Sequence, residues 1–188
     1  SIASSDNRTV SKMLHGIGNF ERIGDHALNV AQSAQEMHDK QISFSTEAKS
    51  ELQAMRAALT ETVHLAFDAF CKDDLNLAHQ VEPMEEVIDT FNMRMKKKHI
   101  ERLQKAACTV ELGYIFQDLL TNFERISDHC SNIAVYQIQV PKDEYDAHEY
   151  LQNVKHQEHA EFDREEMAYE KQYRLPDVAR VQTAKAGE

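Results

Sequence analysis

The chain has 188 residues, a formal net charge of −11 and a hydrophobic fraction of 41%. Five Gly, three Pro and no Trp indicate a helical protein with few turns. Nucleic-acid surfaces need clustered Lys and Arg, so the acidic balance argues against one and suits a cation-binding surface better. The sequence shows no apolar run near the roughly 18 residues of a membrane span and no signal-peptide pattern.

Apolar residues spaced by three and four predict a series of amphipathic helices and no strands. Asp6 and Asn7 are the nearest N-cap candidates for the first helix. Gly16 and Gly18 are expected to let a neighbouring helix approach closely, and Pro83 predicts a kink or a restart in the third helix. The helices are expected at about 7–39, 46–74, 75–105, 110–140 and 143–173, with a frayed tail beyond 176.

An eight-residue stretch occurs twice, at 19–26 and at 122–129, and the register of the two copies holds for five further residues. Such a repeat defines the unit from which a fold is built. The second copy closes a complete series of three helices, whereas the first begins almost at the N-terminus. We therefore expect a fragment of a longer protein with this division: 1–42, the third helix of a truncated first unit; 43–140, a complete three-helix unit; 141–188, an acidic C-terminal helix and tail.

The repeated stretch has two faces. At about 100° per residue, its Phe and Ile positions form a buried stripe. A second stripe lies on a different face at spacing i, i+4, i+8, and it consists of Glu124, Asp128 and Asn132 in one copy and Glu21, Asp25 and Asn29 in the other.

Two carboxylates one turn apart repel each other, and the same cost occurs in both copies. Arg22 and Arg125 offer compensation as ion pairs, and a bound metal ion offers the alternative, since hard cations prefer clustered oxygen ligands. The adjacent His26 and His129 strengthen the metal hypothesis.

A third acidic pair, Glu85 and Asp89, lies in the expected third helix. If that helix lies beside the fourth, these two carboxylates and those of Glu124 and Asp128 converge on one site. Glu82 and Glu86 form another pair at the same spacing, which shows that this signal alone is unspecific.

The stretch Phe-Glu-Arg-Ile-x-Asp-His, at the end of a three-helix unit, resembles the metal-binding helix of the PhoU family of phosphate-uptake regulators. The segments 99–104, 108–113 and 118–134, with the acidic tail after Pro141, look more specifically like the cytoplasmic C-terminal PhoU-like domain of bacterial sodium/phosphate cotransporters. The resemblance implies an all-α, PhoU-like antiparallel bundle that holds a multinuclear iron or zinc site, with other divalent cations as alternatives. The implied metal ligands are Glu124, Asp128, Glu85, Asp89, Glu21 and Asp25, with Arg22, Arg125, His26, His129, Asn29 and Asn132 as supporting residues.

The same resemblance implies a regulatory domain, not an enzyme, at the cytoplasmic face of the membrane, with the transporter portion of the same polypeptide as its partner. The open apolar side of the first helix is expected to be covered by the C-terminal helix or by a second copy of the chain. The basic run 96–98, with Arg94, Arg102 and Lys105, has two interpretations: contact with anionic lipid or the transporter, or a solvated helix face.

Three alternative functions remain at this point. One is a free-standing PhoU-type regulator. Another is a carboxylate di-metal enzyme, which is disfavoured because such sites use Glu-x-x-His pairs that point into the bundle. The last is a structural helical module without metal.

Overall fold

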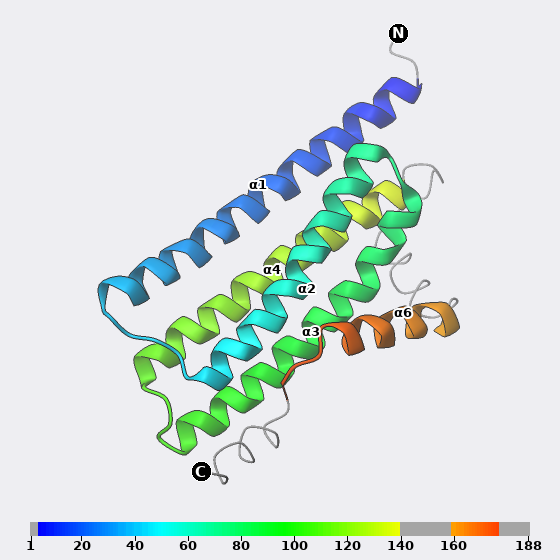
Figure 1. The fold of residues 1–188 in the computed structure, drawn as a ribbon. Helices are drawn as coiled ribbons and strands as arrows, with labels where there is room; N and C mark the ends of the chain where they lie inside the picture. The colour runs from blue at the N-terminus through cyan, green and yellow to red at the C-terminus, as the bar shows by residue number, and fades with distance from the viewer. Residues whose placement is uncertain (1–3, 140–158, 177–188) are drawn as a thin grey trace.

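A computed structural model describes residues 4–139 and 159–176, and its regular elements are all helices (Figure 1). The described helices are α1 (Ser4–Asp39), α2 (Thr46–Lys72), α3 (Leu75–Gln104), α4 (Val110–Gln139) and α6 (His159–Gln172). The all-α prediction is therefore confirmed. Within the described residues, no helix has the length and apolarity needed to cross a membrane.

Side-chain caps start three of the helices where the sequence predicted breaks. The Ser45 hydroxyl accepts a hydrogen bond from the Ala48 amide at 3.2 Å, and the Asp74 carboxylate accepts one from the Asn76 amide at 2.9 Å. The Thr109 hydroxyl caps α4 in the same way. Each cap satisfies an amide that would otherwise lack an intrahelical acceptor.

The three connections between the long helices share one backbone feature. Gln41, Asp73 and Ala106 have φ angles of 53°, 56° and 51°. These left-handed residues end α1, α2 and α3, and at each end the amides that follow bond back to carbonyls of the last turn. Each connection therefore reverses the chain within a few residues.

Several boundary predictions need correction. The helix α1 begins at Ser4, so the proposed caps Asp6 and Asn7 lie inside its first turn. The helix α3 runs from Leu75 to Gln104 through the buried Pro83, so the predicted restart does not occur. The predicted helix 143–173 is described only as α6, and residues 140–158 and the tail beyond 176 lie outside the described residues.

The helix α4 is the centre of the bundle, since it packs against α1, α2 and α3 (Figure 1). The buried stripe predicted for it is confirmed: Phe123, Ile126, Cys130 and Ile133 are all buried. From α3, Phe91 completes the core at this level. The shorter α6 lies across α3.

One face of α1 stays open. Val10, Met13, Leu14 and Ile17 are between 52% and 66% exposed, and Leu28 is 57% exposed. Because α6 packs on α3, the C-terminal helix as described does not cover this face. The expectation that α6 would cover it is therefore wrong for the described residues.

Of the two glycines expected to allow a close helix approach, only Gly16 has a close neighbour, and that neighbour is a side chain of another helix. A Cβ atom built on Gly16 would lie 2.3 Å from Cε2 of Phe70, so the Phe70 ring of α2 packs against the α1 backbone without room for a side chain. A Cβ on Gly18 would meet nothing within 4 Å. Gly16 is therefore needed for packing, and Gly18 is not.

Alanine substitution should separate these two roles. We expect Gly18→Ala to raise the free energy of unfolding by about 0.5–1 kcal/mol, because alanine is the better helix former. Gly16→Ala gains the same propensity but must displace the Phe70 ring, so its stability should be at least about 1 kcal/mol below that of Gly18→Ala. Urea unfolding followed by circular dichroism measures both, and equal stabilisation of the two variants would contradict the close approach.

A buried ionic group joins α2 to α3 near the end of the bundle. Glu51 is fully buried and accepts a hydrogen bond from Arg102 Nη1 at 2.9 Å, while Lys98 lies 3.3 Å from its other oxygen. The guanidinium lies over the Phe116 ring, which also stacks on the buried imidazole of His99. Burial lowers the pKa of His99, and the charge of Arg102 lowers it further.

A His99→Phe variant tests this burial. In the unfolded chain His99 gains a proton below about pH 6.5, whereas in the fold it stays neutral to lower pH. The unfolded state therefore binds more protons in that window, and stability decreases as pH falls below about 6.5. Phenylalanine keeps the ring contact with Phe116 but cannot titrate, so the melting temperature of His99→Phe should fall less between pH 7.5 and 5.5. His64→Phe, at an exposed position, is the matched control. If the melting temperature of His99→Phe falls with pH as steeply as that of the wild type, the buried neutral imidazole is contradicted.

Candidate metal centre

The two repeat copies pack against each other as antiparallel neighbours on α1 and α4. His26 Nδ1 lies 2.9 Å from Asn122 Oδ1, and His129 Nδ1 lies 3.0 Å from Asn19 Oδ1. The two contacts are equivalent, since Asn19 and His26 hold the positions of Asn122 and His129 in the repeat. The imidazole rings stack between them with centroids 5.7 Å apart. The repeat therefore contacts itself through its own Asn and His residues.

These contacts define the proton positions on the imidazoles. Asn19 and Asn122 each donate their amide Nδ2 to the carbonyl of the residue one turn earlier, at 2.9 Å. Their Oδ1 atoms therefore face the imidazoles, and each imidazole donates from Nδ1. Burial lowers the pKa of His129, and the charges of His26 and Arg22 add to this effect. The lowered pKa favours the neutral form of His129 at the α1–α4 contact.

The acidic pairs of α3 and α4 lie along one helix interface. Asn92 Nδ2 donates to Glu124 Oε2 at 2.7 Å, and the Ser131 hydroxyl donates to Glu82 Oε2 at 2.6 Å. Because the helices are antiparallel, these two contacts bracket the stretch that carries Glu85 and Asp89 on α3 and Asp128 on α4. The predicted neighbourhood of α3 and α4 is therefore present.

Protein cations lie beside both carboxylates of the second copy. Lys96 Nζ lies 3.0 Å from Glu124 Oε2, and Arg125 Nη1 lies 3.4 Å from Asp128 Oδ2. These partially exposed pairs contribute little to stability. Burial raises the pKa of Asp128 and the charge of Glu124 adds to the rise, while Arg125 opposes it. Arg125 thus acts as the ion-pair partner that the sequence offered as one of two forms of compensation.

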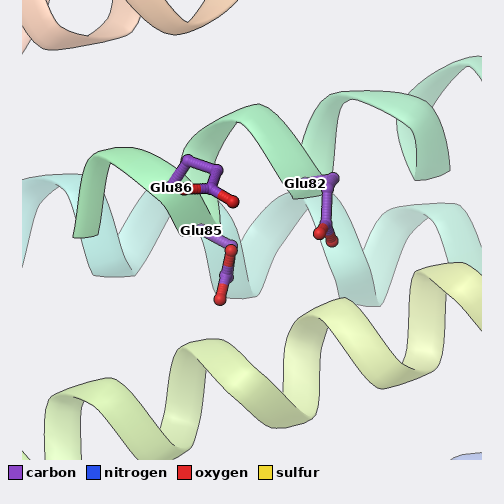
Figure 2. A group of neighbouring side chains, drawn as sticks. All are labelled: Glu82, Glu85 and Glu86. Atoms are coloured by element: carbon purple, nitrogen blue, oxygen red, sulfur yellow. The ribbon is translucent and has the colours of Figure 1, made fainter. Parts of the chain in front are cut away.

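The closest group of carboxylates found in the described residues lies on α3 itself. Glu82, Glu85 and Glu86 each offer an oxygen, and the three oxygens lie within 4.8 Å of one another. Figure 2 shows Glu82 and Glu85 extending toward α4. The fully buried Ser127 lies one turn before Ser131 on the α4 face that meets them, and its hydroxyl has no hydrogen-bond partner.

The first repeat copy presents its carboxylates differently. Glu21 and Asp25 are exposed on α1, and so is Arg22. Asn29 does not extend this acidic stripe, because its amide donates to Asn122 Oδ1 at 3.1 Å. The structure therefore brings no second acidic helix beside Glu21 and Asp25 within the described residues, in contrast to the α3–α4 pairs.

Sequence reasoning missed two members of the α3 cluster as candidate ligands. Glu82 and Glu86 were treated as a sign that i, i+4 acidic pairs are unspecific. The usable signal was the set of three, since glutamates at i, i+3 and i+4 share one helix face. Asn92 and Lys96, which contact Glu124, had no local signal, because their role depends on the register between two helices.

The donor set fits a hard cation. All ligand candidates on the α3–α4 interface are carboxylate oxygens, with hydroxyls beside them. Oxygen donors suit magnesium, calcium, manganese and iron, whereas zinc sites are richer in His and Cys. Nδ1 of His129, the imidazole next to Asp128, is already engaged by Asn19. A hard cation thus matches the available chemistry better than zinc does.

Part of this helical bundle is similar to a known protein family. Residues 52–136, which include α3 and most of α2 and α4, match the PhoU domain. Residues 52–136 are thus similar to the PhoU domain, and the acidic α3–α4 interface lies within the matched residues. No solved structure matches the chain.

Curated relatives carry related names. The chain is 28% identical to phosphate-specific transport system accessory protein PhoU homolog 1 of Thermotoga maritima, over 68% of this chain and 54% of that protein. It is 26% identical to the PhoU homolog of Pseudomonas aeruginosa, over 70% of this chain and 54% of that protein. The putative inorganic phosphate export protein YjbB of Salmonella typhimurium is 22% identical, over 79% of this chain and 28% of that protein. The chain thus spans about half the length of these PhoU homologues.

Removal of Asn122 tests the contact between the repeats. Asn122→Ala leaves the His26 imidazole and the Asn29 amide without their buried acceptor, so we expect a loss of about 1–2 kcal/mol in unfolding free energy. Asn132→Ala is the matched control, because Asn132 is exposed on the same helix. Urea unfolding measures both, and equal stabilities of the two variants would show that the Asn–His contacts contribute nothing.

Proposed function

We propose that this chain is a metal-binding regulatory module of the PhoU family that controls phosphate transport. The acidic α3–α4 interface carries the proposal, because it lies within residues 52–136 and gathers oxygen donors from two helices. The names of the relatives, which refer to phosphate-specific transport and phosphate export, support the phosphate connection. In this proposal the chain regulates and does not catalyse.

The proposed metal ligands are Glu85, Asp89, Glu124 and Asp128, with Glu82 and Glu86 added from the cluster on α3. Glu124 joins the site by exchanging Lys96 for the metal ion, which needs only a side-chain rotation at a partly exposed position. Iron is the first candidate, because the sequence resemblance implies iron or zinc and the donors are carboxylate oxygens instead of His and Cys; zinc and other divalent cations are the alternatives. Glu21 and Asp25 form a second site once another acidic helix lies beside them.

The preferred setting is a domain of a sodium/phosphate cotransporter at the cytoplasmic face of the membrane. The match to the Salmonella export protein supports this setting, since it uses most of this chain and a small part of that protein. The proposed partner is then the transporter portion of the same polypeptide. The division into 1–42, 43–140 and 141–188 belongs to this proposal, and a second copy on the open face of α1 would give a homodimer.

A free-standing regulator is the second candidate. The Thermotoga and Pseudomonas PhoU homologues favour it, because this chain covers 54% of each, a larger share than it covers of the export protein. Purification of the native protein from its source distinguishes the two settings: a domain of a cotransporter requires detergent for extraction, and a free-standing regulator does not.

Metal binding is tested on protein purified without chelator or an affinity metal. We expect elemental analysis after dialysis against ferrous or zinc salts to give bound metal in wild type. Glu85→Gln combined with Asp128→Asn should lower it by about tenfold or more, because each lost carboxylate removes a charged ligand. Glu36→Gln combined with Asp39→Asn, at the far end of α1, is the charge-matched control.

The same variants connect the metal site to function. In a bacterial strain without its own phosphate-uptake regulator, the wild-type chain should alter labelled-phosphate uptake, and the Glu85 and Asp128 double variant should not. Metal content that is equal in the double variant and the control would refute the carboxylate site. If a variant without bound metal still controls phosphate uptake normally, regulation does not depend on the metal site.

A further inference from the structure

A basic cleft lies between α3 and α6, on the far side of α3 from the carboxylates that meet α4. Its volume is about 590 Å³, a size typical of small-molecule sites. The cationic side chains in its lining are Arg94, Lys97, Lys98, Lys171 and Arg174, and the acidic ones are Glu101 and Glu170. The lining thus carries three more positive than negative charges in a chain whose net charge is −11.

The two helices supply these cations from opposite sides. On α3, Lys97 and Lys98 follow Arg94 by one turn, and α6 brings Lys171 against them. Arg94 Nη1 lies 2.5 Å from Glu170 Oε1, and the Tyr169 hydroxyl donates to Gln80 at 3.2 Å. The described contacts therefore dock α6 on α3 and set the walls of the cleft.

Part of the positive charge is held in place by the protein. Lys98 donates to the Pro176 carbonyl at 2.9 Å and lies 3.3 Å from the buried Glu51. By contrast, Lys97 and Lys171 are exposed and pair with no acidic side chain among the described residues. A cleft with an excess of one sign of charge concentrates counter-ions. Here the ammonium groups of Lys97 and Lys171 are available to bind an anion.

The remaining lining is apolar. It consists of Met167, which is 67% exposed, Leu175 and Pro176. A single carboxylate would engage at most one or two of the cations. Several phosphate groups in one ligand would engage Lys97, Lys171 and an arginine together, since arginine and lysine are the usual partners of phosphate oxygens.

We propose that the cleft between α3 and α6 binds a small anion that carries two or more phosphate groups. This site is separate from the carboxylate interface and does not depend on a metal ion there. A nucleotide and an inorganic polyphosphate share the recognised chemistry, and they differ in whether a base contacts the apolar side chain of Met167.

Calorimetric titration of metal-free protein tests this site, because absence of metal prevents phosphate from binding through a cation at the carboxylates. Tripolyphosphate and ATP are the probes, with inorganic phosphate and citrate for comparison. We expect both probes to bind at least about tenfold more tightly than inorganic phosphate or citrate, and to weaken as ionic strength rises. Tighter binding of ATP than of tripolyphosphate would assign the nucleotide, and the reverse would assign the phosphate chain.

Paired variants locate the binding. Lys97→Gln combined with Lys171→Gln should weaken the binding of tripolyphosphate by about tenfold or more, since the loss of one charged contact lowers affinity by roughly that factor. Lys49→Gln combined with Arg56→Gln removes two exposed charges from α2 and should leave binding unchanged. Both pairs are at exposed positions, and thermal melting verifies that the fold is retained.

Four results would overturn the proposal. They are no measurable binding of either probe at millimolar concentration, equal affinity for citrate, equal weakening by the two variant pairs, and binding of the protein to vesicles of anionic lipid without binding of either probe. The last result would assign the basic cleft to a membrane surface instead of a small anion. None of these outcomes bears on metal binding, so the two proposals fail independently.

Discussion

The burial of α4 on three sides is the constraint on which the rest of the bundle depends. A helix in contact with α1, α2 and α3 cannot leave polar side chains unsatisfied on those faces without a cost of about 1–3 kcal/mol for each group. Asn122, Ser131 and Glu124 are polar residues on these faces, and each has a partner on a neighbouring helix. These partners fix the register of α1 and α3 on α4.

The same constraint gives the repeated stretch two different functions. On the α1 side, its Asn and His residues join the two copies to each other, so the repeat serves as its own binding surface. On the α3 side, its carboxylates meet a second acidic helix. One sequence motif thus builds an internal contact and presents an oxygen-rich interface, depending on which face of the helix is considered.

Sequence periodicity was sufficient for the helices and for much of the core, because burial imposes spacings of three and four on every long helix. The α3–α4 neighbourhood was only a condition in the sequence reasoning, and the structure meets it. Periodicity could not identify contacts that depend on register or on crossing angle. The pairing of Lys96 with Glu124 and the basic cleft under α6 join residues whose proximity no local pattern encodes. The cluster of Glu82, Glu85 and Glu86 is different, because its i, i+3, i+4 spacing was a usable local signal.

The left-handed residues Gln41, Asp73 and Ala106 indicate that the packed helix faces, and not the connections, determine this fold. A non-glycine residue in that conformation costs roughly 1–2 kcal/mol, and none of the three connections uses glycine to avoid it. Turns of this kind do not form by their own preference, so the packed helices must hold them in place. The connections are therefore consequences of the bundle, and apart from the capping residues Ser45, Asp74 and Thr109 their sequences are free to vary as long as the helix faces that they join still match.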